Sequence, residues 1–298
     1  MDIFLQQIIN GLTLGSVYAV VALGYTMVYG IIQLINFAHG EVVMIGAMVA
    51  FSVITLLAGS GVPPVLILAA SVLAAIPVCM AVGYTMERIA YRPLRRAPRL
   101  APLITAIGMS SILEGAMYLW KGPFNLHYPD LLPATRLNIG GASIGAKDLI
   151  VLSFAIVLVV AFTLFINLSK LGKAMRATAQ DRDAAQLMGI DINRTIAATF
   201  FIGAVLAGAG GIIYGLYINN VAFDLGFITG LFAFTAAVFG GIGNIPGAAI
   251  GGLLIGIIAA FNNGYFDSAW TEIVIFGILI ATLVFRPTGL LGMRVPEK

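Results

Sequence analysis

The sequence has few charged residues and very few of the residue types that build disulfide or metal frameworks. Only 10% of its 298 residues are charged, whereas soluble domains carry roughly 25%. The single cysteine, Cys79, excludes an internal disulfide and a cluster of thiolate ligands. The two histidines, His39 and His127, belong to no paired ligand motif. A water-soluble globule and a metal centre are therefore both disfavoured, and we expect no cofactor.

A phosphate-binding loop is also missing. The only Gly-Lys pair is Gly172-Lys173, and Ala174 follows it where such a loop requires Ser or Thr. Asn167 stands where the loop would need its first glycine. The sequence also suggests no grouping of Ser, His and carboxylate for nucleophilic catalysis. We therefore expect a chain that is not an enzyme and that binds neither nucleotide nor nucleic acid.

Hydrophobic residues are abundant, at 60% of the chain, and the mean hydropathy is +1.02. Crossing a bilayer takes roughly 20 helical residues. Stretches of that length lie at about 4–31, 41–58, 64–87, 100–120, 148–168, 195–218 and 270–286. Unbroken apolar runs favour helices over the alternating strands of a barrel. We predict an all-α polytopic membrane protein, with one transmembrane domain over residues 1–298.

One further apolar stretch, 227–262, is too long for one crossing and is interrupted at 240–247 by the sequence GGIGNIPG. Glycine and proline at this density cannot continue a helix. Two interpretations remain: two short spans that meet at a turn, or a broken span whose loop is held inside the protein. The second would indicate a transport pathway, because irregular backbone at membrane depth needs protein or water to satisfy it. Eight or nine spans follow.

Basic residues are concentrated in three segments. They are Arg88, Arg92, Arg95, Arg96 and Arg99; Lys170, Lys173, Arg176, Arg182 and Arg194; and Arg286, Arg294 and Lys298. The remaining three, Lys121, Arg136 and Lys147, flank or lie in the loop 121–147. The positive-inside rule places the three rich segments in the cytoplasm. The loop 121–147 is then periplasmic, and the amino terminus lies outside.

A few polar residues lie inside or between the spans, where a charged side chain costs about 2.5–3.5 kcal/mol on insertion scales. Glu114 stands beside Ser110 and Ser111. It is either satisfied by neighbouring hydroxyl or backbone groups or lines a pathway.

Asn36, His39 and Glu41 cluster where the first span gives way to the second. Asn36 either caps the following helix, with Glu41 in its first turn, or the cluster forms a gate or cavity lining. Gly241, Gly243 and Asn244 of the interrupted stretch complete the candidate pathway residues.

The predicted cytoplasmic segment 169–194 contains a short helix. Thr178 followed by Asp181 resembles a capping box, and Gly189 is typical of a left-handed helix end. The helix between them has about ten residues and is roughly 15 Å long. We expect it to be continuous with the flanking spans, with Ala184, Leu187 and Met188 on one face. Such short helices are marginal alone, so it either docks in a groove of another protein or lies on the bilayer surface.

Glycine pairs, a Gly-Gly turn and two aromatic residues predict three further features. Glycine pairs spaced four apart allow close helix crossings, which we assign to packing within the chain; they are Gly11 and Gly15, Gly211 and Gly215, Gly247 and Gly251, and Gly252 and Gly256. The segment 137–144 alternates around Gly140-Gly141 and predicts a small hairpin. Trp120 and Tyr128 either fit an aromatic belt at the membrane interface or contact a delivered ligand directly.

Several separated motifs resemble a known family. Asp183-Ala184-Ala185 followed by Gly189 is similar to the Glu-Ala-Ala-x-x-x-Gly loop of ABC importer permeases. Residues 24–30 (GYTMVYG), 35–41 (INFAHGE), 176–181 (RATAQD) and 240–244 (GGIGN) occur in the order found in permeases of the bacterial high-affinity branched-chain amino acid importers, the LivH type. The resemblance covers essentially the whole chain.

The resemblance implies a multi-pass permease of the bacterial inner membrane that forms half of a pathway for leucine, isoleucine and valine. It also implies a homologous second permease, two cytoplasmic ATP-binding subunits and a periplasmic binding protein. The expected ATPase-coupling residues are Arg176, Thr178, Asp181, Asp183, Ala184, Ala185, Leu187, Met188 and Gly189. An ABC permease for urea or short amides, an ion-coupled secondary transporter and a membrane-anchored scaffold stay open as alternatives.

Overall fold

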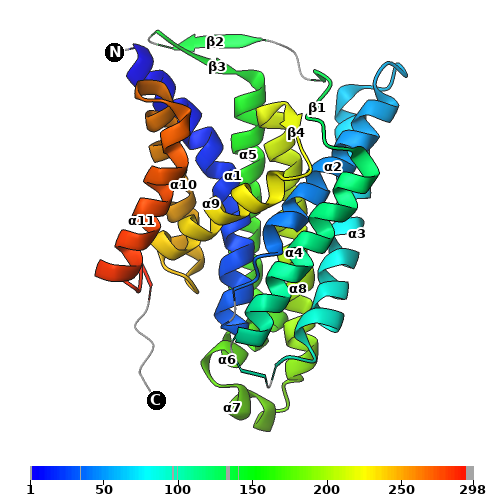
Figure 1. Cartoon of the computed structure of the whole chain (residues 1–298), viewed down its shortest axis with the longest axis vertical. Coiled ribbons are helices and arrows are strands. Elements are labelled where there is room, and N and C mark those ends of the chain that lie inside the picture. The colour runs from blue at the N-terminus through cyan, green and yellow to red at the C-terminus, as the bar shows by residue number, and fades with distance from the viewer. Residues whose placement is uncertain are drawn as a thin grey trace.

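The computed structural model describes residues 2–33, 35–95, 97–98, 100–131, 135–139 and 141–292, which form a bundle of helices (Figure 1). Its helices are α1 (Asp2–Ile32), α2 (His39–Leu57), α3 (Pro64–Met86) with the π-helical turn η1 (Glu87–Tyr91), α4 (Leu100–Lys121), α5 (Ala146–Leu168), α6 (Lys170–Gln180), α7 (Arg182–Leu187), α8 (Ile192–Ile218), α9 (Leu225–Gly240), α10 (Ile245–Tyr265), the 3-10 turn η2 (Ser268–Trp270) and α11 (Thr271–Phe285). Its strands are β1 (Leu126–His127), β2 (Arg136–Ile139), β3 (Ala142–Gly145) and β4 (Asn220–Val221).

Within this described part of the chain, eight helices are long and apolar enough to cross a membrane. The shorter apolar helix α9 is additional. The prediction of an all-α polytopic membrane protein is therefore confirmed. The interrupted stretch 227–262 is two helices, α9 and α10, joined by a turn over residues 241–244.

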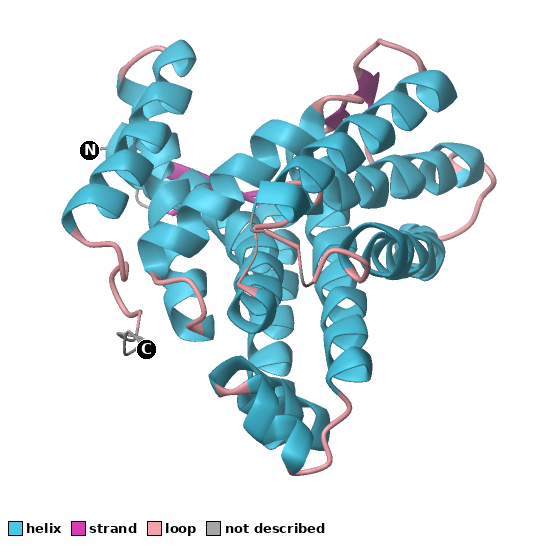
Figure 2. Ribbon diagram, turned by 60° about the horizontal axis from the view of Figure 1, so that its bottom comes forward, coloured by secondary structure: helices cyan, strands magenta, loops and turns pink. Residues whose placement is uncertain are grey.

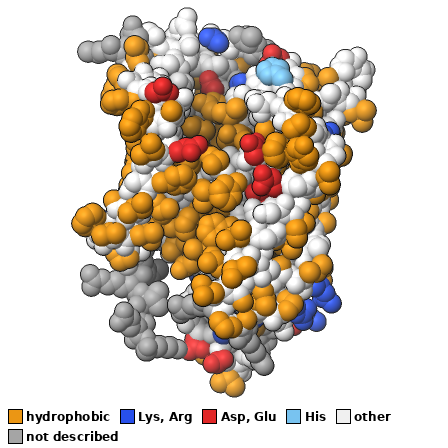
Figure 3. Space-filling view, viewed as in Figure 1, with side chains coloured by type: hydrophobic (Ala, Val, Ile, Leu, Met, Phe, Trp, Pro, Cys, Tyr) orange, Lys and Arg blue, Asp and Glu red, His pale blue; other side chains and the backbone are white. Residues whose placement is uncertain are grey.

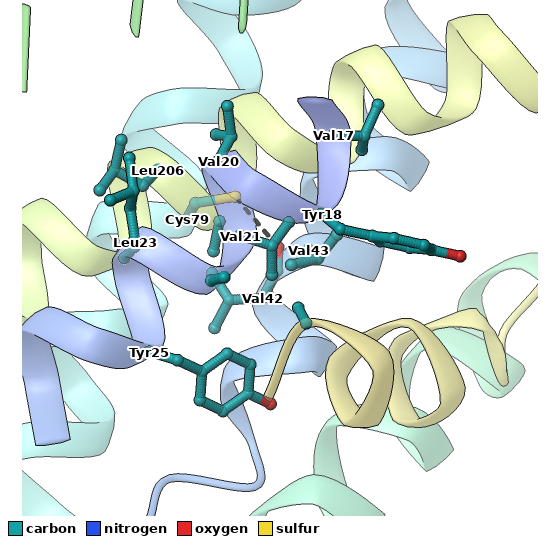
Figure 4. Packing of buried hydrophobic residues seen from close by; sticks show 14 of the residues in the cluster. Val17, Tyr18, Val20, Val21, Leu23, Tyr25, Val42, Val43, Cys79 and Leu206 are labelled. Carbon is teal, nitrogen blue, oxygen red and sulfur yellow. Dashed lines mark hydrogen bonds between the residues drawn. The ribbon is translucent and has the colours of Figure 1, made fainter. Parts of the chain in front are cut away.

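The centre of the bundle is formed by α1, α2, α8 and α10. In α1, 89% of the most apolar window is buried inside the protein, against 17% in α4 and in the span that η2 and α11 form together. Valines of α1 and α2 pack together beside Cys79 of α3, whose thiol donates to the Val42 carbonyl at 3.5 Å (Figure 4). The central helices are thus held by protein contacts, whereas the outer ones present apolar side chains outward.

Close approach of α1 and α10 depends on glycine. An added Cβ on Gly15 would stand 2.8 Å from the Cα of Leu253, and one on Gly256 would overlap the backbone of Gly15. Contacts this short leave no room for a side chain, because packing at the density of protein interiors does not absorb an extra methyl group. The prediction that these glycine pairs serve packing within the chain is confirmed for this crossing.

The two ends of the bundle differ. One end carries β2 and β3, which pair as the predicted hairpin, and the amino-terminal turns of α1 (Figure 1). The Gln6 amide donates to the Ser143 carbonyl there, at 3.1 Å. We call this the hairpin end.

The opposite end carries α6 and α7, which project beyond the bundle (Figure 2). We call it the α6–α7 end. Arg95 donates to Asn193 there, so two of the basic segments predicted to share a side do lie together. Arg96, Arg99, Gly140, Arg294 and Lys298, which also entered the predictions, lie outside the described residues.

Tyr128 does not belong to an interfacial belt as predicted. Its side chain is fully buried, its hydroxyl donates to the Ala47 carbonyl, and its ring packs edge-on against Phe51. Burial raises the pKa of the Tyr128 phenol well above its usual value. The side chain therefore fastens the loop after α4 onto α2. Trp120 is half exposed, and Lys121 lies over its ring at 4.4 Å.

Candidate functional site

The connection between α1 and α2 returns into the bundle before α2 begins. An added Cβ on Gly24 would overlap the imidazole of His39, the first residue of α2. Gly24 stands about two turns before the end of α1, which corresponds to roughly 12 Å along the helix. The amino end of α2 therefore lies inside the bundle rather than at its surface.

Two features terminate α1: a left-handed residue and a hydrogen-bonding side chain. Gln33 adopts a left-handed conformation with φ 58° and donates its backbone N–H to Tyr29 at 2.7 Å, which is a common way to end a helix. The Arg182 guanidinium then donates to the carbonyls of Ile31 and Ile32, both at 2.9 Å. Carbonyls that the helix leaves unpaired are thereby satisfied by a side chain of α7.

Asn36 has a different role from the predicted cap. The residue that caps α2 is Ala38, and no side chain bonds to the first turn. The Asn36 side-chain oxygen instead accepts a hydrogen bond from the Tyr91 hydroxyl at 2.8 Å, and both side chains are buried. The prediction that Asn36 caps α2 is wrong because its side chain faces η1. It ties the α1–α2 connection to the end of α3.

Three polar atoms near this connection are buried without a hydrogen-bond partner among the described residues. They are Thr26 Oγ1, His39 Nε2 and Glu41 Oε2. Glu41 is 0% exposed, and its other oxygen accepts from the Ser110 hydroxyl at 2.8 Å. Unpartnered buried polar groups cost free energy and are rare in native proteins. Two of the three belong to the first turn of α2, where the Glu41 carboxyl group faces α4 and α9 and the His39 ring faces α1 and α8.

The carboxylate of Glu41 lies between α4 and the first turn of α9. An added Cβ on Gly226 would stand 2.8 Å from the Glu41 carboxyl carbon. The carboxylates of Glu114 and Asp224 are close enough to interact electrostatically with it. Glu114 is half-buried and Asp224 is exposed. We call Glu41, Glu114 and Asp224 the carboxylate group.

This group belongs to the face of the bundle that α9 crosses. On that face, Asp and Glu side chains stand on a largely hydrophobic surface in the half nearer the hairpin end (Figure 3). Glu114 lies inside the span 100–121. Because a carboxylate at membrane depth is costly in lipid, this face is suited to a protein partner or a water-filled pathway.

Sequence reasoning found part of this site. It singled out Glu41 and Glu114, which the structure brings together. His39, which it also singled out, faces Gly24 of α1 instead. The Ser110 hydroxyl, one of the neighbouring groups considered for Glu114, bonds Glu41 instead. It missed Asp224, although a carboxylate between two apolar stretches was a signal.

The other candidate pathway residues form a separate turn. Asn244 accepts from the Gly247 N–H at 3.1 Å as the cap of α10, and its amide donates to the Leu291 carbonyl at 2.6 Å. Gly241 and Gly243 have φ of 115° and 89°, values that favour glycine. These contacts give all three a role in shaping the turn, and their role in a pathway stays a prediction.

The predicted coupling segment is folded differently from expectation. Ser169 caps α6, and Thr178 lies inside α6, where its hydroxyl donates to Ala174 at 2.8 Å. Asp181 is extended and caps α7 by accepting from the Asp183 and Ala184 N–H groups. The predicted Thr178 capping box is therefore wrong, because an Asp side chain that bonds the next backbone N–H groups starts a new helix.

The expected ten-residue helix is also shorter, and it is not continuous with the flanking spans. α7 has six residues, and extended residues at Ser169, Asp181 and Asp191 separate α5, α6, α7 and α8 from one another. Gly189 has φ 84°, so the predicted left-handed end is confirmed.

Two apolar side chains of α7 and its cap face outward. Leu187 is 89% exposed and Met188 83%, while Ala185 is buried beneath them. Asp183 and Ala184 are exposed on the same short helix. Arg176 donates to the carbonyls of Ile166 and Asn167, which fixes α6 to the end of α5. Thus α6 is held to the end of α5, and the end of α7 exposes the apolar side chains of Leu187 and Met188.

A cavity of about 600 Å³ opens at the hairpin end. Its polar lining includes Gln6, Asn10, Asp130, Arg136 and Asn219. The Asn219 amide donates to Asp130 at 3.0 Å. This is a second candidate site, at the opposite end from α7.

Comparison with known proteins completes these observations. A family model described as branched-chain amino acid transport system / permease component matches residues 7–283. The chain is 47% identical to the high-affinity branched-chain amino acid transport system permease protein BraD of Pseudomonas aeruginosa, over 99% of this chain and 98% of the relative. It is 44% identical to the LivH permease protein of Escherichia coli K12, over 99% and 97%.

A more distant relative is the probable branched-chain amino acid transport permease protein LivM of Methanocaldococcus jannaschii, 28% identical over 56% of each chain. No solved structure matches the chain significantly.

Proposed function

Because the chain belongs to the family of permease components of branched-chain amino acid transport systems, we propose that it forms half of an ATP-driven pathway for leucine, isoleucine and valine. The chain is a multi-pass membrane protein and a transport component rather than an enzyme. The observation that carries the proposal is the similarity to the BraD and LivH permeases over nearly the full length of both chains.

The proposed assembly lies in the bacterial inner membrane. Besides this chain it contains a second permease, two ATP-binding subunits and a binding protein. A second, homologous permease covers the face that α9 crosses, and the similarity to LivM supports such a partner. Two ATP-binding subunits on the cytoplasmic side bind the α6–α7 end. A periplasmic binding protein docks at the hairpin end, where the 600 Å³ cavity opens.

The coupling contact in this proposal is the tip of α7. Leu187 and Met188 are almost fully exposed and match a helix that seats its apolar side chains in a groove of another protein. Movement of the docked α7 reaches the pathway through Arg182, which holds the carbonyl end of α1. This replaces rigid continuity with the flanking spans, which the breaks at Asp181 and Asp191 exclude.

The cargo is tested with the assembled transporter. The permease is reconstituted in vesicles with its partner permease, ATP-binding subunits and binding protein, and uptake of labelled leucine, isoleucine and valine is measured. We expect ATP-dependent uptake of all three. Uptake of urea or short amides instead, or leucine uptake by the permease alone under an ion gradient, would overturn the proposal.

The coupling contact is tested with Leu187→Glu, which places a charge on the exposed tip and removes no internal packing. We expect the variant to insert normally and to lose at least about tenfold of ATP-dependent uptake, because burying an unpaired charge in an apolar groove costs several kcal/mol. Gly189→Glu is expected to act in the same direction.

Gln180→Glu, which adds the same charge to an exposed residue of α6, is the matched control and should transport normally. Unchanged uptake by Leu187→Glu would contradict the assignment of the contact to α7.

A further inference from the structure

We infer that the carboxylate group is a binding site for the ammonium group of an amino acid with an apolar side chain. The inference rests on the proposed function and names the groups that would receive its cargo. Glu41, Glu114 and Asp224 come from three different helices or their caps, α2, α4 and α9. Helices that are far apart in the sequence therefore contribute acidic side chains to one region of the bundle.

The observation that points to a ligand is the Glu41 carboxyl group. It is fully buried, and Oε2 has no hydrogen-bond partner among the described residues, although Oε1 accepts from Ser110 at 2.8 Å. A buried carboxylate oxygen without a donor is costly. An ammonium group supplies three N–H donors and a positive charge, which is the chemistry that this oxygen lacks.

The two other carboxylates of the group also have no basic partner. Glu114 and Asp224 interact electrostatically with Glu41 and are accessible from the surface. No basic side chain is paired with any of the three in the described part of the chain. Three acidic side chains without a countercharge attract a cation. Among the same described residues, no three His, Cys, Asp or Glu side chains are grouped closely enough to hold a metal ion.

Aromatic rings border the carboxylates. Tyr118 stands about one turn after Glu114 on α4, and Phe223 directly precedes Asp224. Their rings meet edge to face, with centroids 5.2 Å apart. Aromatic faces attract ammonium ions and also contact aliphatic chains. Carboxylates beside these rings suit a molecule that has an ammonium group next to a hydrocarbon side chain.

The start of α9 carries the partial positive charge of a helix N-terminus, which suits the carboxylate of an amino acid. No side chain caps its first turn, and Asp224 makes no capping hydrogen bond. The unpaired N–H groups of a helix start favour a negative group. The carboxylate of a zwitterionic amino acid would meet this helix end while its ammonium group faces Glu41. The ligand class is therefore an aliphatic α-amino acid, recognised by both charges.

The first experiment measures uptake of labelled L-leucine and ATP hydrolysis by the complete transporter in vesicles. We expect Glu41→Gln, Glu114→Gln and Asp224→Asn each to lower leucine uptake about tenfold or more, as expected for the loss of a charge-assisted hydrogen bond. ATP hydrolysis should continue. Glu272→Gln removes an exposed carboxylate in the first turn of α11 and is expected to leave uptake unchanged.

The second experiment measures ligand binding at the site through the rate at which a nearby thiol is labelled. Cys79 is the only native cysteine and is buried, so Ala222→Cys places a single, partly exposed thiol two residues before Asp224 and keeps the Phe223 ring. We expect L-leucine to slow labelling of this thiol. 4-Methylpentanoate, which lacks the amino group, should give no protection. Adding Asp224→Asn or Glu114→Gln should abolish the protection by leucine.

The outcomes separate the two proposals. A native complex that moves no branched-chain amino acid would overturn the proposed function. A native complex that moves leucine, together with carboxylate variants that transport equally well and no protection by leucine, would overturn only the ammonium site. Protection by sodium chloride in place of leucine would assign the group to an inorganic cation and also overturn it. If Glu41→Gln does not fold, Glu114→Gln and Asp224→Asn carry the test, because neither side chain is buried.

Discussion

The chain has two interruptions between neighbouring apolar helices, and they are built in opposite ways. Between α9 and α10, Asn244 caps the second helix, while Leu290 and Leu291 donate backbone N–H groups to Phe239 and Gly240 at 2.9 and 3.0 Å. Between α1 and α2, the second helix has no side-chain cap, and its first turns carry His39 and Glu41 with unpartnered atoms. A break satisfied by its own chain serves architecture, whereas an unsatisfied one is available for a ligand or for movement.

Among substitutions at the two interruptions, Arg182→Ala is expected to lower leucine uptake the most. The substitution removes the charged donor from the Ile31 and Ile32 carbonyls, a bond type worth about 1.5–3 kcal/mol, and separates α7 from α1. We expect ATP hydrolysis by the assembled transporter to continue while leucine uptake falls at least about tenfold. Arg194→Ala, which removes only an exposed pair with Asp191, should have little effect. Equal uptake by both variants would show that α7 does not act through α1.

A smaller effect is expected from Asn244→Ala at the satisfied break. Loss of the cap costs about 1 kcal/mol, and loss of the bond to Leu291 adds to it. The thermal unfolding midpoint of the purified protein should fall, and leucine uptake per folded molecule should stay at the native level. A large loss of uptake without a lower midpoint would instead place Asn244 in the pathway.

The smallest effect is expected from Gly243→Ala. An added Cβ meets no atom within 4 Å, so only the left-handed backbone opposes it. That strain costs about 1–2 kcal/mol, and the unfolding midpoint should fall by no more than in Asn244→Ala. Gly277→Ala is a matched control, because it lies in α11, where an added Cβ is equally uncrowded. A midpoint for Gly243→Ala equal to that of Gly277→Ala would show that the turn tolerates a side chain.

The helical fold could be predicted because hydropathy reports length and lipid contact directly. The segments 64–87, 100–120 and 148–168 match α3, α4 and α5 within a few residues. Hydropathy does not report depth, however. Nothing in the pattern of residues 33–41 shows that the chain turns back and that α2 begins level with Gly24 of α1.

The site could be predicted only in part, because its key contacts join distant residues. Glu41 and Ser110 are 69 positions apart, and Asn36 and Tyr91 are 55 apart. A local rule gave Asn36 the role of a cap, since it precedes a helix, but the Tyr91 hydroxyl competes for its side chain. Gly189 was predictable because a left-handed helix end depends on one residue and its neighbours.

The caps of α7 have a consequence for how this segment meets another protein. Asp181 closes its first turn and Gly189 its last, so its six residues are already ordered in the isolated chain. Association then requires little loss of conformational entropy, and a small contact area can suffice. Substitutions at either cap should therefore change the lifetime of the complex without altering a single atom at the contact surface.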